Sequence, residues 1–251
     1  MNDTIAKPFI FDDEPFATTT DGPITYHHKL IQGSEEWLQA RLGVLTASEM
    51  KLALTPTLKT ARNDKIRAHV FQLAAERVTG FTEPHFESYD MARGHIDETF
   101  ARAAYIDEFG PIRMMGFITN TRHGPKIGYS PDGLVGDDGL WECKSRSPKY
   151  QVRTAVQAKD GDSFVPPVEY FLQLQTGLLV AERKWIDFSS YCGGMPMLTM
   201  RVWPDEATQA AIIEAAQTIE ADIEKVLADY RHALPHLRPV KTERVKYEDY
   251  I

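Results

Sequence analysis

The sequence predicts an α+β (α/β) fold, with a central mixed β-sheet flanked by helices. Two patterns along the chain support this prediction. Apolar residues recur at helical spacing between Gly33 and Gly110 and again in the last part of the chain, whereas the middle holds short apolar runs separated by Gly, Pro and Asp. The 251 residues are 43% hydrophobic and 25% charged, which is typical of a globular protein, so we expect one domain.

The first part of the chain is expected to contribute little to the fold. Residues 1–24 lack apolar periodicity, which predicts a loosely held N-terminal arm followed by a single domain at residues 25–251. Helices are predicted at residues 34–41, from Thr46 onward, at 61–78 before Gly80, and at 91–109 before Gly110. His27 and His28 form a pair to which we assign no role.

The middle section is predicted to form strands. Short strand patterns occur at residues 116–119, 126–129, 133–135 and 140–145. Asp137-Asp138-Gly139 separates the last two and is typical of a hairpin turn. We therefore expect a small antiparallel meander.

The last third of the chain mixes both kinds of element. A loop that ends in Pro166-Pro167 is predicted to lead into a helix at residues 168–183, with strands following at 185–192 and 197–203. A final amphipathic helix at about residues 205–231 has an apolar stripe made of Ile212, Ala215, Ile219, Ile223 and Val226. This stripe is expected to seal a core or an interface.

Composition argues against several classes of protein. The chain contains no run of eighteen apolar residues, and its first residues lack the layout of a secretory signal, so we expect a soluble, cytoplasmic protein without a membrane partner. Cys143 and Cys192 have no paired spacing suited to zinc, and reduced thiols are expected. The formal net charge of −8 disfavours a surface that binds phosphates throughout, but the local field in a cleft decides nucleic-acid binding.

One predicted hairpin carries residues suited to catalysis. Glu142 and Lys144 are two apart on a strand, so their side chains share a face about 6 to 7 Å apart. The turn at residues 137–139 would bring Asp132 beside Glu142, and paired carboxylates suit Mg²⁺ or Mn²⁺. A metal there could activate water against a phosphodiester, with Lys144 assisting. The alternative is an ordinary charge pattern on a solvated strand, with Asp132 in a turn.

Longer segments add a family resemblance. Ser-Pro-Asp-Gly-Leu at residues 130–134 and Glu-Cys-Lys at 142–144, with matching segments at 33–48, 94–98 and 170–175, resemble the lambda-type phage exonucleases. These are also called YqaJ-type viral recombinase nucleases and belong to the PD-(D/E)XK superfamily, with its restriction-endonuclease-like core. The resemblance implies a Mg²⁺-dependent 5′→3′ exonuclease (Mn²⁺ may substitute) that degrades one strand of linear double-stranded DNA.

The resemblance also implies roles for individual residues. Asp132, Glu142 and the backbone carbonyl of Cys143 would hold the metal, and Lys144 would assist the attacking water. Glu98 would add an acidic group at the metal, directly or through water, with Asp97 as its competitor; an ion pair between Glu98 and Arg102 is the alternative. Gln173 would contact the substrate or the water, whereas Gln175 faces another direction and is expected to be structural or solvent-facing.

A second group of residues is implied to hold the 5′-phosphate of DNA: Arg41, Ser48 and Ser130. Independently of the family, Arg41 lies just before Gly43, and Thr46 and Glu49 have the spacing of a capping box at the start of a helix, which would make a phosphate site. An ordinary pair of helices with a surface arginine is the alternative. Arg146, Lys149 and Arg153 follow the Glu-Cys-Lys strand and could either follow the DNA backbone or form a solvated basic face.

The resemblance further implies partners: a duplex with a free 5′-phosphorylated end, further copies of the chain in a ring trimer, and a single-strand annealing protein in phage-type recombination. The location would be the cytoplasm of the bacterial host. Two other functions stay open from the sequence. One is an endonuclease or repair nuclease with the same core, and the other is a non-catalytic DNA-binding or assembly module.

Overall fold

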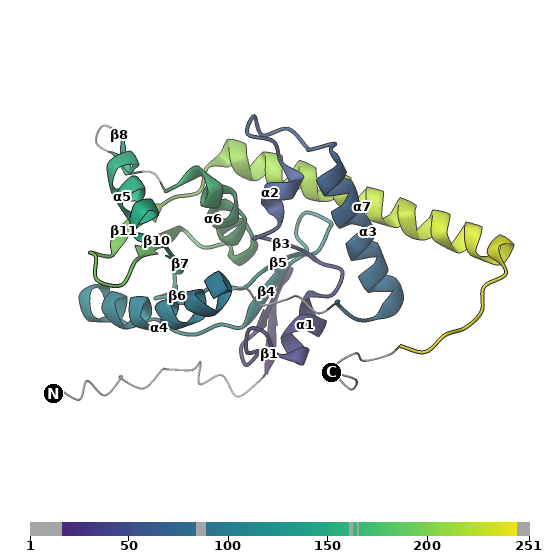
Figure 1. The fold of residues 1–251 in the computed structure, drawn as a ribbon, viewed down its shortest axis with the longest axis horizontal. Coiled ribbons are helices and arrows are strands. Elements are labelled where there is room, and N and C mark those ends of the chain that lie inside the picture. Colours follow the sequence, from purple (N-terminus) through teal and green to yellow (C-terminus); the bar gives the residue numbers. More distant parts are fainter. Residues whose placement is uncertain (1–16, 84–88, 161–162, 165, 245–251) are drawn as a thin grey trace.

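The computed structural model describes residues 17–83, 89–160, 163–164 and 166–244, and confirms a mixed α+β fold (Figure 1). Its helices are α1 (Glu35–Arg41), α2 (Met50–Ala53), α3 (Asp64–Thr79), α4 (Tyr89–Phe109), α5 (Pro148–Gln157), α6 (Val168–Ala181), α7 (Glu206–Ala233) and the 3-10 helix η1 (Leu234–Leu237). Its strands are β1 (Thr18–Asp21), β2 (Ile24–His27), β3 (Leu45–Thr46), β4 (Phe117–Asn120), β5 (Ile127–Tyr129), β6 (Gly133–Val135), β7 (Gly139–Ser145), β8 (Lys159–Asp160), β9 (Ser163–Phe164), β10 (Trp185–Tyr191) and β11 (Leu198–Val202).

The strands form two main sheets rather than one central sheet. One sheet has the order β1-β2-β4-β5-β3, and the other has the order β11-β10-β7-β6. Each contains one parallel pair, β3 with β5 and β7 with β10, among antiparallel neighbours. Both sheets are therefore mixed, and helices pack against them, as the sequence predicted.

The predicted antiparallel meander is wrong at its centre. β4 pairs with β5 and β6 pairs with β7, but β5 belongs to the first sheet and β6 to the second. The chain changes sheet at Ser130-Pro131-Asp132, where Pro131 has no N–H to donate to a ladder. This break places Asp132 at the junction of the two sheets.

The N-terminal arm predicted at residues 1–24 is wrong in its last part. Residues 1–16 lie outside the described residues. However, β1 pairs with β2, with Thr18 opposite His27 and Asp21 opposite Ile24, and β2 in turn pairs with β4. Gly22, with φ 55°, makes the tight turn between the two strands. A hydrogen bond of 2.6 Å joins Nε2 of His28 to Oγ1 of Thr19, so His28 has a structural partner in this hairpin.

Most predicted helices are confirmed, with two differences. The helix expected from Thr46 is wrong, because Leu45 and Thr46 pair with β5 and α2 begins only at Met50. Helix α5 was not predicted. Strands β8 and β9 follow it, in the segment before Pro166-Pro167 that was predicted to be a loop. Helix α3 keeps its predicted end at Gly80, which has φ 76°.

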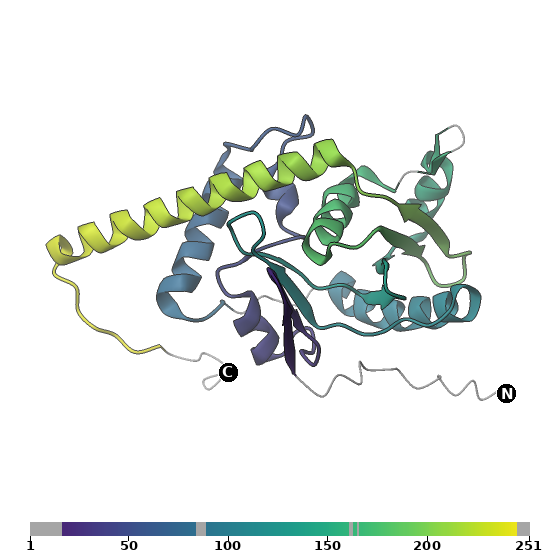
Figure 2. The ribbon, with the colours of Figure 1, turned by 180° about the vertical axis from the view of Figure 1, so that it is seen from behind.

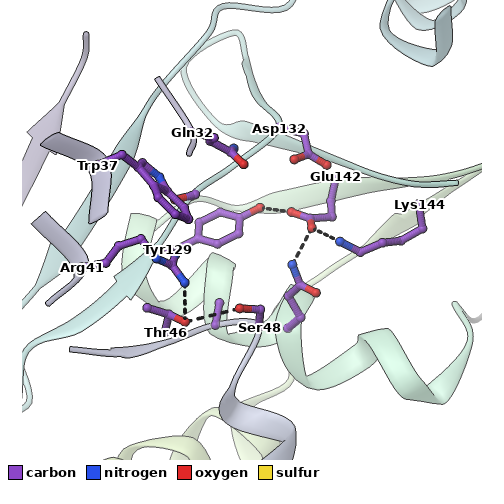
Figure 3. A pocket seen from close by; sticks show the side chains of 12 residues that line it. Gln32, Trp37, Arg41, Thr46, Ser48, Tyr129, Asp132, Glu142 and Lys144 are labelled. Atoms are coloured by element: carbon purple, nitrogen blue, oxygen red, sulfur yellow. Dashed lines mark hydrogen bonds and ion pairs between the residues drawn. The ribbon is translucent and has the colours of Figure 1, made fainter. Parts of the chain in front are cut away.

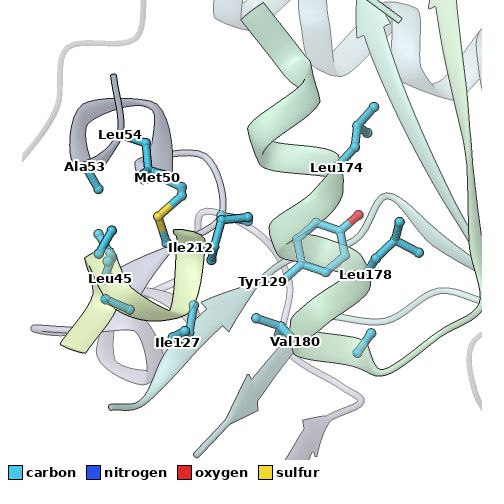
Figure 4. Close-up of a cluster of buried hydrophobic side chains, with 14 of the residues drawn as sticks. Leu45, Met50, Ala53, Leu54, Ile127, Tyr129, Leu174, Leu178, Val180 and Ile212 are labelled. Atoms are coloured by element: carbon cyan, nitrogen blue, oxygen red, sulfur yellow. The ribbon is translucent and has the colours of Figure 1, made fainter. Parts of the chain in front are cut away.

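The main core lies between the sheets and α2, α6 and α7 (Figure 4). Met50 of α2, Tyr129 of β5, Leu174 of α6 and Ile212 of α7 are all at most 1% exposed and belong to it. The predicted stripe of the last helix is buried here, except that Val226 is only partly buried and Leu227 takes its place. A smaller cluster joins α4 to the far face of β7.

Helix α7 crosses α3 and extends past the body of the protein (Figures 1 and 2). Arg77 of α3 forms an ion pair of 2.7 Å with Glu220 of α7 and donates to the carbonyl oxygen of Gly43. The segment between α1 and β3 is thereby tied to both helices. Among the described helices, none is long and apolar enough to cross a membrane.

Candidate active site

A pocket of about 170 Å³ opens where the two sheets meet (Figure 3). One side, here called the carboxylate wall, consists of Tyr129, Asp132, Glu142, Lys144 and Gln173. The opposite side, here called the Arg41 wall, consists of Trp37, Arg41, Thr46, Ser48 and Ser130. Gln32 and Ala47 complete the lining.

The alternation of β7 builds the carboxylate wall. Trp141 and Cys143 point to the cluster under α4, so Glu142 and Lys144 point to the pocket on the other face. The Nζ of Lys144 donates to Oε1 of Glu142 at 2.7 Å. The predicted common face for these two side chains is confirmed.

Glu142 is held by donors on both of its oxygens although it is only 1% exposed. The hydroxyl of Tyr129 donates to Oε2 at 2.7 Å, while Lys144 and the amide of Gln173, at 2.5 Å, donate to Oε1. Tyr129 reaches this position because Gly177 of α6 makes room for its ring: a Cβ on Gly177 would stand 2.8 Å from the ring. The orientation of Glu142 is therefore fixed before any substrate binds.

Asp132 lies next to Glu142 in the strand pairing, since Gly133 of β6 is opposite Trp141 of β7. Its Oδ2 accepts a 2.7 Å hydrogen bond from the backbone N–H of Cys143. Burial raises the pKa of Asp132 well above its usual value, and the carboxylates of Glu142 and Glu98 raise it further. Burial acts to lower the pKa of Lys144, but the charges of Glu142 and Asp132 outweigh it and keep the amine protonated.

Glu98 lies on α4 beside this group but outside the pocket lining. Its carboxylate accepts a hydrogen bond from Arg102, the ion pair that the sequence left open as an alternative. Burial raises the pKa of Glu98, and the Glu142 carboxylate adds to the effect. Asp97 points elsewhere and accepts from the hydroxyl of Ser145 at 2.5 Å. Of these two competitors, Glu98 is the one whose charge reaches the site.

The carboxylate wall suits a hard divalent cation. Among the described residues, no three His, Cys, Asp or Glu side chains already form a complete set of ligands. However, Asp132, Glu142 and Glu98 lie close together in a buried place, where burial first and the repulsion of neighbouring carboxylates second raise the pKa of Asp132 and of Glu98. Carboxylate oxygens with an excess of negative charge are the ligands that Mg²⁺ or Mn²⁺ prefers. Asp132 and Glu142 therefore fit such an ion.

The Arg41 wall holds one guanidinium between an aromatic ring and a hydroxyl. Arg41 lies 4.2 Å from the centre of the Trp37 ring, and its Nη2 donates to Oγ1 of Thr46 at 3.2 Å. The indole N–H of Trp37 donates to Oγ of Ser130 at 2.9 Å, and Oγ of Ser48 lies 3.3 Å from Oγ1 of Thr46. Arg41, Ser48 and Ser130 thus line the same pocket, with donors suited to an anion.

Ser48 does not lie in the first turn of a helix, contrary to the predicted capping box. Glu49 does accept from the backbone N–H of Thr46 at 2.9 Å, so half of that pattern forms. The hydroxyl of Thr46, however, donates to the Glu49 carboxylate, because Thr46 ends strand β3 instead of capping α2. A helix N-terminus therefore contributes nothing to the Arg41 wall at Ser48.

Gln175 has the structural place expected for it, bonded to the backbone of Trp203 and Asp205. Arg146 and Arg153 both contact Glu169, and with Lys149 they surround the ring of Tyr150 beyond the pocket. The sequence did not predict Tyr129 and Trp37 as parts of the site, and it placed Thr46 there only as a helix cap. Trp37 lies within a segment of the family resemblance, which was the available signal for it.

Comparisons with known proteins agree on one family. The profile of the YqaJ-like viral recombinase domain matches residues 36–184. An alkaline exonuclease from Laribacter hongkongensis is 30% identical in sequence, with a TM-score of 0.69, and the match covers 81% of this chain and 100% of that chain. The same enzyme in complex with dAMP gives 31% identity and a TM-score of 0.70 over the same shares of both chains.

A more distant structure shows the fold alone. A phage related exonuclease from Haemophilus somnus 129PT is 11% identical, with a TM-score of 0.52, and the match covers 74% of this chain and 96% of that chain. A search among curated proteins gave no match.

Proposed function

We infer that this chain is a Mg²⁺-dependent 5′→3′ exonuclease. It belongs to the YqaJ-like viral recombinase family and is a deoxyribonuclease. It would degrade one strand of linear double-stranded DNA from a 5′-phosphorylated end and leave a 3′ single strand. Nucleases of this family generally use a divalent metal ion.

A single observation supports this proposal most strongly: both walls line one small pocket. Arg41 and Ser48 stand on one side and Asp132 and Glu142 on the other, within about 170 Å³. A terminal phosphate held by the Arg41 wall would thus lie close to the bond that is cut at the carboxylate wall. An enzyme built in this way measures its cut from the end of the strand.

Residues in and beside the carboxylate wall would have different tasks in the hydrolysis. Asp132, Glu142 and the carbonyl of Cys143 would hold the metal, which when bound supplies an activated water and polarises the phosphodiester. Lys144, kept protonated by its neighbours, stabilises negative charge that develops on the phosphate. Gln173 holds Glu142 and stands where it can also orient the attacking water. Glu98 would contribute through water, since Arg102 holds its carboxylate.

Arg41→Ala tests the end recognition. Loss of charged hydrogen bonds to the phosphate should raise KM for a 5′-phosphorylated linear duplex roughly 10- to 100-fold, and should remove the preference over a 5′-hydroxyl duplex. The measurement is digestion of end-labelled duplexes in Mg²⁺ and in EDTA. Arg62→Ala is a matched control, because Arg62 forms an exposed ion pair with Asp222 away from the pocket.

The rival function is an endonuclease or repair nuclease with the same core. Such an enzyme would cut circular and linear DNA alike and would be indifferent to the chemistry of the end. Equal digestion of a closed circle and a linear duplex would reject the exonuclease assignment. Undiminished digestion in EDTA would reject the metal.

The proposal extends to partners. Phage-type recombination would require a single-strand annealing protein to take over the 3′ strand, in the cytoplasm of a bacterial host. A ring trimer around the DNA would allow an acidic exterior, consistent with the net charge of −8, to coexist with a DNA-binding interior.

A further inference from the structure

Thr46 stands at the centre of the Arg41 wall and is contacted by three polar side chains. Nη2 of Arg41 lies 3.2 Å from Oγ1 of Thr46, Oγ of Ser48 lies 3.3 Å from it, and Oε2 of Glu49 lies 2.6 Å from it. Thr46 itself is 1% exposed and is fixed in β3 by pairing with Gly128 of β5. Its hydroxyl is therefore a fixed point in an otherwise solvent-facing wall.

The direction of these hydrogen bonds follows from the chemistry of the groups. The hydroxyl of Thr46 has one proton, and the shortest contact assigns it to Glu49, since a carboxylate only accepts. Although burial acts to raise the pKa of Glu49, the interaction with His69, the hydrogen bond from Thr46 and the charge of Arg41 outweigh it and hold that pKa below its usual value. The oxygen of Thr46 is thereby left as an acceptor, and Arg41 and Ser48 both donate to it.

Glu49 is itself held from two sides. Its Oε2 accepts from the backbone N–H of Thr46 at 2.9 Å, and Nε2 of His69, a buried side chain on α3, lies 3.7 Å away. The carboxylate therefore cannot turn toward Arg41 without giving up these contacts. Glu49 stays on the Thr46 side and does not line the pocket, whereas Arg41 does.

We propose that Thr46, oriented by Glu49, is a positioning residue that holds the guanidinium of Arg41 ready for the terminal phosphate of DNA. This inference rests on the proposed function of the pocket as a DNA-end site. Stacking on Trp37 fixes the plane of the guanidinium but allows it to rotate over the ring. The hydrogen bond to Thr46 removes that rotation, so the remaining donors of Arg41 point into the pocket.

A purely structural role of Thr46 and Glu49 would have a different effect on the two kinds of substrate. If Thr46 and Glu49 served only to join β3 to α2, their loss would lower the stability of the protein and affect every substrate alike. A positioning role instead affects substrates that carry the 5′-phosphate more than those that lack it. The ratio of kcat/KM for 5′-phosphorylated over 5′-hydroxyl linear duplex, in Mg²⁺, separates the two.

Thr46→Val removes the hydroxyl at nearly constant volume. We expect the ratio to fall roughly ten-fold through a higher KM for the phosphorylated duplex, because a hydrogen bond to a charged group is lost. Thr46→Ser keeps the hydroxyl and should keep most of the preference. Thr199→Val is the matched control, since Thr199 lies outside the pocket, on β11, and also bonds a hydroxyl, that of Ser189.

Glu49→Ala provides a second route that keeps the Thr46 side chain, although it also removes the acceptor of the Thr46 backbone N–H. Without the carboxylate, the proton of Thr46 is free to face Arg41, and the ratio should fall as it does in Thr46→Val. The inference is overturned if both variants keep the wild-type ratio while Arg41→Ala loses it, or if both substrates suffer equally. If Arg41→Ala itself keeps the preference, the DNA-end pocket is wrong and the role of Thr46 is wrong with it.

Discussion

The two walls of the pocket differ in what supports them. The carboxylate wall stands on paired strands, with Glu142 and Lys144 on β7 between β6 and β10. The Arg41 wall stands at the end of a seven-residue helix and on a two-residue strand, and depends on long side chains reaching in from α3. In the proposed function, the chemistry is therefore assigned to a sheet, and end recognition is assigned to a connection between short elements.

The largest effect is expected from Asp132→Asn in the carboxylate wall. Loss of several kcal/mol of metal and charge stabilisation should lower kcat about a thousand-fold or more. In EDTA the same variant should unfold at a higher temperature than wild type, because it removes a carboxylate whose charge is disfavoured by burial first and by the repulsion of Glu142 and Glu98 second. Digestion rates and thermal unfolding in EDTA check both parts.

Asp187→Asn is the contrasting change. Asp187 is also buried, but it pairs with Arg201 and accepts from the hydroxyl of Tyr105. Its variant should unfold at a lower temperature and retain its kcat. Strong digestion by Asp132→Asn in Mg²⁺ would remove the carboxylate wall as the site of chemistry.

A smaller effect is expected from Tyr129→Phe. Removing one donor from Glu142 should lower kcat roughly ten-fold and raise the Mg²⁺ concentration needed for half-maximal rate, since groups that orient a metal ligand have effects of this size. Tyr105→Phe is the matched control, because it also removes a hydroxyl from a buried carboxylate, that of Asp187. An unchanged Mg²⁺ requirement in Tyr129→Phe would show that the other donors to Glu142 suffice.

The smallest effect on activity is expected from Gly43→Ala, which disturbs the support of the Arg41 wall. Gly43 has φ 65°, and an added Cβ would stand 2.4 Å from Cγ of Arg77, so we expect a loss of about 1 to 3 kcal/mol in the free energy of unfolding. The preference for 5′-phosphorylated ends should fall only a few-fold. Gly22→Ala has a similar φ of 55° with open space around it, so the difference between the variants isolates the clash with Arg77. Equal losses in the two would assign the whole effect to backbone strain.

The parts of this site that follow local rules could be predicted from sequence. The period of two on a strand places Glu142 and Lys144 together, and the 3.6-residue helical period separates Gln173 from Gln175. Asp132 beside Glu142 follows from a hairpin turn between them. These relations need only residues close together in the chain.

Other parts depend on contacts between distant residues. Thr46 has the sequence of a helix cap, but pairing with Gly128 of β5 makes it a strand end. Tyr129 reaches Glu142 only because Gly177, far along the chain, leaves space for its ring. Helix α5, by contrast, has a local signal in the sequence, since Pro148 follows Ser147 at the start of the helix.

The position of α7 near the end of the described chain has a consequence for the order in which the fold is completed during synthesis. Every residue that lines the pocket is synthesised before α7, yet Ile212 and Ile219 of α7 complete the main core and Glu220 secures Arg77 behind Gly43. A ribosome-bound chain that has not yet extended through this helix lacks the support of the Arg41 wall. The late position of α7 thus leaves the Arg41 wall without the Glu220 contact behind it until this helix has been synthesised.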